Sequence, residues 1–214
     1  MQHSGNNFKS FIQSQLKKDS EKIQIPRLSF EQRQHFRKAA VLIPVYWDEQ
    51  RRALMGIYIQ RAREILQSGQ EAIHSGQIAF PGGKIEPGEQ PLQTALREAR
   101  EEIALEPDSV DILGHLGTFS TLTSHFMTEA FVGWLHRAPV LHRNHGEVAA
   151  IFHIPFVDLI PQHQEQRHFN LQRWQDMIAL HYHWTSPHHH RTICIWGMTG
   201  RMTWVFLEKV FFIG

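Results

Sequence analysis

The sequence is poor in cysteine and lacks long apolar runs. Its single cysteine, Cys194, lies in the apolar segment 193–196, so no disulfide can form within the chain and a reducing compartment is compatible. This setting favours a buried, inert thiol over a nucleophile. No stretch reaches the roughly 18 apolar residues of a membrane-spanning helix, and residues 1–7 lack the apolar core of a signal peptide. The sequence therefore predicts a soluble, cytoplasmic protein that does not enter a membrane.

A strong excess of charge of either sign is also missing. The chain has 22 Lys and Arg against 21 Asp and Glu, and this balance argues against nucleic acid as the main partner. Its hydrophobic content of 42% in 214 residues is enough for one large domain. We expect that domain over residues 37–214, preceded by a helical extension over residues 1–36. Apolar residues at helical spacing in 8–16 favour a helix packed on the domain over one on a membrane surface.

The remaining pattern mixes strands and helices. Two strand-like runs at residues 39–47 and 54–60 flank a polar turn and predict a hairpin. A helix is expected after Pro91, with apolar residues in the i, i+3, i+4, i+7 pattern from Leu92 to Ile103. Further strand-like runs occur at 110–116, 130–135, 148–154 and 192–196, and a helix is expected at 200–212.

The polar face of the helix after Pro91 carries three carboxylates. Glu98, Glu101 and Glu102 are spaced i, i+3 and i+4, so they share one side. Like charges at this spacing destabilise a helix by about 0.2 to 0.5 kcal/mol per pair, which indicates either a solvated surface or a bound cation. Carboxylate oxygens suit a hard ion such as Mg²⁺ or Mn²⁺, which bridges to substrate phosphates.

The segment in front of this helix makes the metal hypothesis specific. The pattern G-x5-E-x7-R-E-U-x-E-E-x-G-U, in which U is aliphatic, is met at Gly83, Glu89, Arg97, Glu98, Glu101, Glu102 and Leu105. Residues 83–105 therefore resemble the Nudix box. Ala104 stands where the box has its last glycine, and Ala99 is a small choice for the first aliphatic position. Because that glycine ends the helix, we expect altered geometry at the exit loop but no loss of catalysis.

The resemblance implies an α/β fold, the Nudix α/β/α sandwich with a mixed β-sheet. It also implies a hydrolase that uses Mg²⁺ or Mn²⁺ to cleave the diphosphate bond of a small-molecule nucleoside diphosphate. By the resemblance, Glu98 and Glu102 match the glutamates that bind the metal in this family. Glu101 and Glu89 match those that assist, and Arg97 matches the arginine that orients a carboxylate.

Glu147 is a further candidate for the catalytic site. It lies just before the strand expected at 148–154, where many Nudix enzymes carry an extra metal ligand or a general base. A solvated acidic residue in a loop is the alternative interpretation of the same position.

The flanks of the box resemble the Nudix branch that cleaves coenzyme A. That branch has the upstream pattern L-L-T-x-R-S-x-x-L-R-x-H-x-G-Q, which runs into F-P-G-G. Residues 57–62 resemble its beginning, and residues 74–77 and 80–83 match its end. The middle differs, because twelve residues separate Arg61 from His74 where the pattern has six. Downstream, stretches within 147–155 and 196–200 resemble the same branch.

We therefore expect hydrolysis of coenzyme A or its derivatives to 3′,5′-ADP and 4′-phosphopantetheine. The substrate-binding candidates are Arg61, His74, Gly82 and Gly83. Arg61 suits the 3′-phosphate of coenzyme A, because arginine can bind a phosphate with two hydrogen bonds. Alternatively, Arg61 is a residue at the end of a strand that holds the helix or loop of the box in place. Two other functions stay open: hydrolysis of another nucleoside diphosphate such as ADP-ribose, and a Nudix-fold binding module without turnover. A homodimer is compatible with the sequence.

Histidine is unusually frequent, with 16 residues, three of them consecutive at 188–190. Imidazole suits zinc, copper or nickel, but no matching cysteines or carboxylates complete a closed site nearby. The sequence favours an exposed polar loop.

Overall fold

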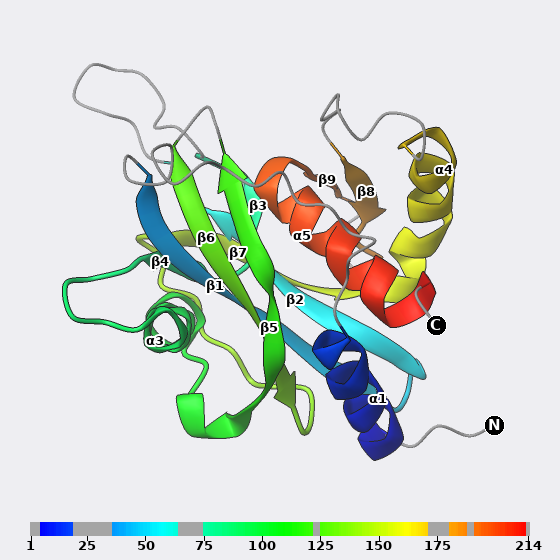
Figure 1. Cartoon of the computed structure of the whole chain (residues 1–214), viewed down its shortest axis with the longest axis horizontal. Helices are drawn as coiled ribbons and strands as arrows, with labels where there is room; N and C mark the ends of the chain where they lie inside the picture. Colours follow the sequence, from blue (N-terminus) through cyan, green and yellow to red (C-terminus); the bar gives the residue numbers. More distant parts are fainter. Residues whose placement is uncertain are drawn as a thin grey trace.

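The computed structural model of the chain describes residues 5–18, 36–63, 75–121, 125–170, 180–187 and 191–212. A seven-stranded mixed sheet forms its centre (Figure 1). The strands are β1 (Arg37–Asp48), β2 (Ala53–Arg61), β3 (Ile78–Ala79), β4 (Gly82–Lys84), β5 (Val110–Thr121), β6 (Phe126–Leu135) and β7 (Val148–Pro155). Their order is β3-β2-β1-β6-β5, with β4 paired to β1 and β7 paired to β2. Strands β1 and β6 run parallel, and the other pairs are antiparallel.

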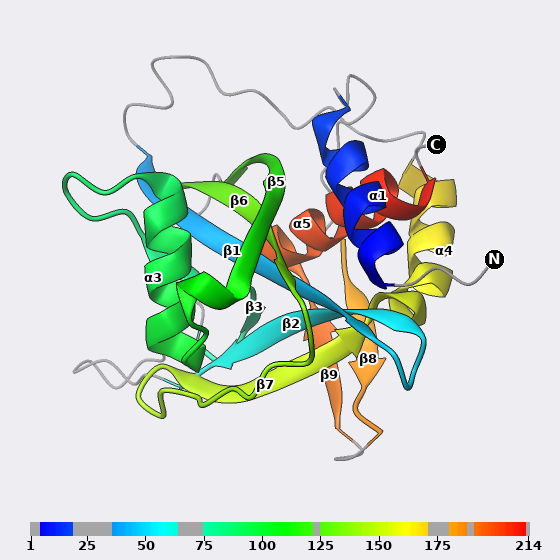
Figure 2. The same cartoon turned by 90° about the horizontal axis from the view of Figure 1, so that it is seen from below.

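Helices cover both faces of this sheet, as the α/β/α prediction requires (Figure 2). Helix α3 (Pro91–Ile103) packs on one face. The other face is covered by α1 (Gly5–Lys17), by α5 (Gly197–Leu207) and by a two-stranded sheet of β8 (Tyr182–Thr185) and β9 (Thr192–Ile195). The remaining helices are η1 (Pro107–Ser109), η2 (Phe156–Leu159), α4 (Ile160–Asn170) and the π-helical turn η3 (Glu208–Phe212), which continues α5.

The predicted hairpin is confirmed, because Val45 lies opposite Gly56 and Asp48 opposite Ala53 in an antiparallel ladder. Strands β5 and β6 are longer than predicted, because they pair with each other as far as Thr121 and Phe126, past their apolar parts. A backbone ladder needs no apolar side chains, so hydropathy alone misses these ends.

The structure corrects the start of the last helix. It begins at Gly197 rather than at residue 200, since the N–H of Gly200 already donates to the carbonyl of Trp196. Helix α4 and strands β3, β4 and β8 were not predicted.

Helix α1 packs on the domain as expected. Ile12 is fully buried and Leu16 nearly so, and both belong to the core that lies between the sheet and α5. A Cβ atom added at Gly114 of β5 would lie 3.3 Å from the side chain of Leu16, so this glycine allows the close approach of the helix. Within the described ranges, no helix is both long and apolar enough to cross a membrane.

The end of α3 contradicts the expected change in exit geometry. Ala104 adopts the left-handed conformation, with φ 54° and ψ 36°, and its N–H donates to the carbonyls of Ala99 and Arg100. The chain thus leaves the helix in the conformation that a glycine would adopt at this position. The prediction was wrong because the fold imposes this exit even on alanine, at a cost of about 1 to 2 kcal/mol in backbone strain.

We expect Ala104→Gly to raise the free energy of unfolding by roughly 0.5 to 1 kcal/mol, because relief of the strain exceeds the entropy that glycine adds to the unfolded chain. Urea denaturation would measure the change. As a control, Arg100→Gly should be about 1 kcal/mol less stable than Arg100→Ala, since this position is right-handed helix. A loss of stability in Ala104→Gly would contradict the proposed strain.

Candidate active site

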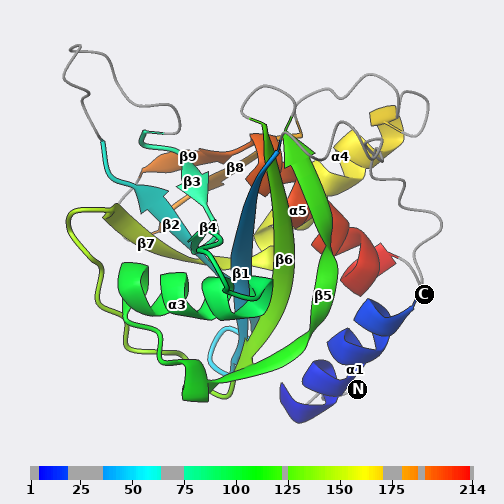
Figure 3. The same cartoon turned by 60° about the vertical axis from the view of Figure 1, so that its left-hand side comes forward.

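Two adjacent glycines let strand β4 lie close to β1 on one side and to α3 on the other. A Cβ atom at Gly83 would lie 2.3 Å from Oε1 of Glu98, and one at Gly82 would lie 2.4 Å from the carbonyl oxygen of Ala40. Neither distance is compatible with a side chain. Gly82 therefore lets β4 lie close to β1, and Gly83 leaves room for the Glu98 carboxylate of α3. Helix α3 lies beside β4 at this place (Figure 3).

Glu102 is the most enclosed acid of this site. Its side chain is 2% exposed, and its Oε2 accepts a hydrogen bond of 2.9 Å from the N–H of Gly82. Nη1 of Arg61 lies 3.6 Å from its other oxygen. Burial raises the pKa of Glu102 to about 8, and the negative charges of Glu98 and Glu147 add to this shift.

Glu147 reaches the same region from a loop that is fixed to the end of α3. The N–H groups of His142 and Asn144 donate to the carbonyls of Ile103 and Glu102 over 3.1 and 2.9 Å. The carbonyl of Glu147 accepts a hydrogen bond of 2.7 Å from Ala62, directly after β2. Its carboxylate is close enough to raise the pKa of both Glu98 and Glu102.

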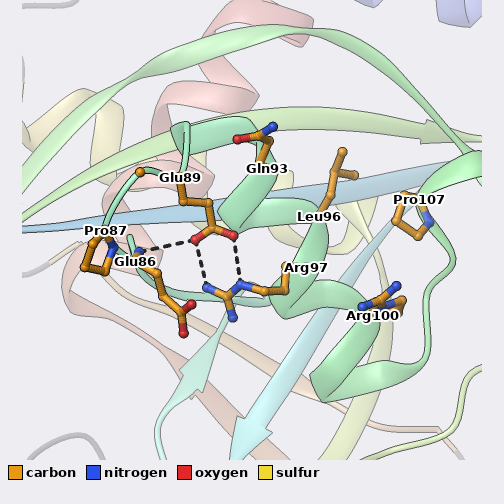
Figure 4. A pocket seen from close by; sticks show the side chains of 9 residues that line it. Glu86, Pro87, Glu89, Gln93, Leu96, Arg97, Arg100 and Pro107 are labelled. Carbon is orange, nitrogen blue, oxygen red and sulfur yellow. Dashed lines mark hydrogen bonds and ion pairs between the residues drawn. The ribbon is translucent and has the colours of Figure 1, made fainter.

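Arg97 connects several acids of the box, and Figure 4 shows its contact with Glu89. Its guanidinium donates to both oxygens of Glu89, over 2.8 and 3.1 Å, and to Glu98 and Glu101 over 2.9 and 3.0 Å. Thr94 donates a further hydrogen bond of 2.6 Å to Glu89. These bonds from Arg97 and Thr94 lower the pKa of Glu89 to about 2 and raise that of Arg97. Arg97 thus contacts three carboxylates of the box at once.

The charge balance of the site fits a divalent cation. Burial, the largest cause, raises the pKa of Glu98, although Arg97 donates to it. Among the residues that the structure describes, the partners of Glu102 are a backbone N–H and a more distant guanidinium. Crowded, desolvated carboxylates are costly unless a positive charge compensates them.

The protein atoms alone do not complete a coordination shell. Among the described residues, no three acidic, histidine or cysteine side chains are gathered closely enough to hold a metal. This is compatible with Mg²⁺ or Mn²⁺, because such an ion keeps several waters and takes further oxygens from substrate phosphates.

The structure brings together most of the expected site residues. Glu98, Glu102, Arg61, Gly82 and Gly83 are joined by the contacts above, and Glu147 stands near them. His74, the altered stretch before it and the histidines at 188–190 lie outside the described residues.

Sequence reasoning missed two groups of the site. One is Thr94, and the other is the N–H of Gly82. Thr94 lies five residues after Glu89, within the first turn of α3, and this position could have indicated a contact between the two.

Comparisons with known proteins point to one family. A family model described as the NUDIX domain matches residues 36–175. Nudix hydrolase 3 of Caenorhabditis elegans is 32% identical over 133 residues, which cover 58% of this chain and 55% of that protein. A Nudix hydrolase of Cronobacter sakazakii named NudL is 33% identical over 184 residues, 82% of each chain. The solved Nudix hydrolase RenU of Mycobacterium smegmatis aligns over 64% of this chain and 87% of its own, with 16% identity and a TM-score of 0.47.

The α/β/α sandwich and its acidic helix thus define one class of protein, and the family model spans well over half of the chain. The chain belongs to the Nudix family. Its relatives in Caenorhabditis and Cronobacter are named as hydrolases, although the alignment spans only 55% of the length of the first.

We expect Glu102→Gln to stabilise the metal-free protein at alkaline pH. The folded state raises the pKa of this carboxyl from 4.5 to about 8, so stability is lost as pH rises between these values. At about pH 9 the variant should gain at least about 1 kcal/mol, and near pH 4 it should match the wild type.

Thermal unfolding in a chelating buffer would measure this difference. The exposed neighbour Glu101, changed to Gln, serves as the control and should show a much smaller dependence on pH. An unchanged or lower stability of Glu102→Gln at about pH 9 would count against the buried, uncompensated charge.

Proposed function

We propose that this chain hydrolyses the diphosphate bond of a small nucleoside diphosphate derivative with Mg²⁺ or Mn²⁺, and that coenzyme A is its substrate. The observation that carries the reaction is the pair of desolvated carboxylates, Glu98 and Glu102, against the Gly82–Gly83 backbone. The intact acidic set argues against a binding module without turnover.

In this proposal, Glu98 and Glu102 hold the divalent cation. When bound, the cation would neutralise diphosphate oxygens and favour attack by water on phosphorus. Arg97 keeps Glu98 in place through its hydrogen bond, and Glu89 in turn fixes the guanidinium with two bonds. Glu101 contacts the same guanidinium from the exposed side of α3.

Glu147 is the proposed proton acceptor for the attacking water. It is exposed, so water can reach it, and its charge acts on both proposed metal ligands. A carboxylate in this position can remove a proton in the transition state.

The coenzyme A assignment is supported by the sequence on both sides of the box. The retained ends of the upstream pattern include Arg61, whose side chain is 40% exposed and lies beside Glu102. Gly82 and Gly83 close the same pattern and border the acids. A substrate diphosphate bound at Glu102 would therefore meet both ends of the pattern.

A hydrolysis panel with magnesium or manganese tests the function. Coenzyme A should be cleaved to 3′,5′-ADP and 4′-phosphopantetheine with a higher kcat/KM than ADP-ribose, NADH or nucleoside triphosphates. Glu102→Gln serves as the inactive control, and it should nearly abolish turnover while keeping the fold. If ADP-ribose is cleaved with the higher kcat/KM, the coenzyme A assignment is wrong and ADP-ribose becomes the proposed substrate. If Glu102→Gln keeps activity within a few-fold of wild type, Glu102 is not a metal ligand.

Glu147→Gln should lower kcat by roughly 100- to 10,000-fold if Glu147 is the general base, with little change in the metal concentration required. A pH–rate profile and a metal titration would be measured on both proteins. A changed metal requirement with a smaller loss of kcat would make Glu147 a ligand instead. Profiles identical to wild type would reduce it to an acidic residue of the loop.

A further inference from the structure

Arg201 is a desolvated cation with very little to compensate it. It lies one turn into α5 and is half-buried. Its Nη1 donates one hydrogen bond of 2.8 Å to the carbonyl of Ser120 at the end of β5. Within the described parts of the chain, no carboxylate forms an ion pair with it, and burial alone accounts for the lowering of its pKa.

This environment is unusual for an arginine. A guanidinium presents five N–H donors, and the described residues supply a hydrogen-bond acceptor to only one of them, the neutral carbonyl of Ser120. Removing a cation from water costs free energy unless an opposite charge or several hydrogen bonds replace the lost hydration. The exposed part of Arg201 therefore has donors left for an anion that comes from outside the fold.

Arg201 lies at the same end of the sheet as the glycine strand of the active site. Ser120 pairs with Met127 of β6, and Met127 pairs with Lys38 of β1. The carbonyl of Lys38 accepts a hydrogen bond of 3.1 Å from Ile85, directly after β4. Figures 1 and 3 show the first turn of α5 beside the ends of β5 and β6.

The surroundings of Arg201 at this end are also basic. Arg37 begins β1 and lies over the ring of Phe126 at 4.2 Å, and Lys84 ends β4 with an exposed side chain. A substrate whose diphosphate lies at Gly82 would pass these residues as it extends round this end of the sheet, from the face that carries α3 to the face that carries α5.

We propose that Arg201 binds a phosphomonoester of the substrate that is separate from the scissile diphosphate, which in coenzyme A is the 3′-phosphate. This inference rests on the proposed function and deepens it. A guanidinium fork matches the oxygens of a phosphate with two parallel hydrogen bonds. A dianionic phosphomonoester also supplies the charge that the protein does not provide.

Arg61 is less suited to this role, although the sequence pointed to it. Its guanidinium lies 3.6 Å from Glu102 and so acts on the proposed metal ligand. Loss of Arg61 should disturb the site for every substrate, whereas loss of Arg201 should matter only for substrates that carry the additional phosphate.

Binding of the nucleotide product tests the inference without turnover. By isothermal titration in metal-free buffer, the wild type should bind 3′,5′-ADP at least tenfold more tightly than AMP. Arg201→Gln keeps a donor for the Ser120 carbonyl but removes the charge, and it should bind both nucleotides within about twofold. Arg201→Lys keeps the charge without the fork, so it should retain part of the preference.

Kinetics on matched substrates provide the second measurement. Arg201→Gln should lower kcat/KM for coenzyme A at least tenfold, mainly through KM, and leave dephospho-coenzyme A within about twofold. Arg61→Ala should lower both alike. Arg51→Gln removes an exposed arginine at the opposite end of β1, where it pairs with Asp48, and it should change neither.

The outcomes separate the two proposals. A wild type that does not distinguish 3′,5′-ADP from AMP, or an Arg201→Gln protein that still does, would overturn phosphate binding by Arg201. If Arg201→Gln fails to fold, the other two variants serve as the test. Arg201→Ala that still prefers 3′,5′-ADP over AMP as strongly as the wild type would overturn the inference, and so would Arg201→Lys with an unchanged preference. The protein could also prefer 3′,5′-ADP over AMP through Arg201 and yet cleave no coenzyme A. That result would support phosphate binding by Arg201 and reject coenzyme A as the substrate.

Discussion

The site depends on one close contact, between the carboxylate of Glu102 and the backbone N–H of Gly82. The contact exists because α3 lies directly on β4, where Gly83 leaves room for the Glu98 side chain of α3 and Gly82 lets β4 lie close to Ala40 and Val41 of β1. The same closeness removes Glu102 from water and raises its pKa to about 8. The packing that builds the site therefore also creates the electrostatic cost that a cation would relieve.

Arg97 limits that cost and organises the rest of the helix face. With its bidentate bond to Glu89 and single bonds to Glu98 and Glu101, one guanidinium offsets part of the repulsion among the acids of α3. It has no hydrogen bond to Glu102 among the contacts above, so it does not offset the cost of charging the deepest acid, whose pKa stays raised. The site thus has an outer part in which Arg97 pairs with carboxylates and an inner part in which charge on Glu102 is costly, and the inner part is where a bound cation would be most favourable.

The sequence predicted the elements whose side-chain pattern repeats, and it missed those that depend on tertiary contacts. The helical spacing of apolar residues was sufficient to predict α3, because Ala95, Ala99 and Ile103 form its fully buried face. Strand β4 has only three residues and is defined by its pairing with β1, which no local pattern reveals. The proximity of Glu147 to the acids of α3 depends on hydrogen bonds from residues 142–144 to the end of that helix. Ala104 shows the same limit, since the fold overrides its conformational preference.

The C-terminal part gives α5 a fixed position, which a phosphate site on Arg201 requires. The hydroxyl of Tyr58 on β2 and that of Thr203 on α5 are 3.1 Å apart in the core, so the helix is attached to the strand that ends at Arg61. Farther along, fully buried His163 contacts the hydroxyl of Tyr182 and the carboxylate of Glu208 over 2.9 and 3.0 Å. Both ring nitrogens of that histidine are thereby used, and α4, β8 and the end of α5 form one polar network inside an aromatic shell. Because a network of this kind is costly to break, it holds the end of α5 in place, and the contact between Tyr58 and Thr203 holds the helix two residues after Arg201.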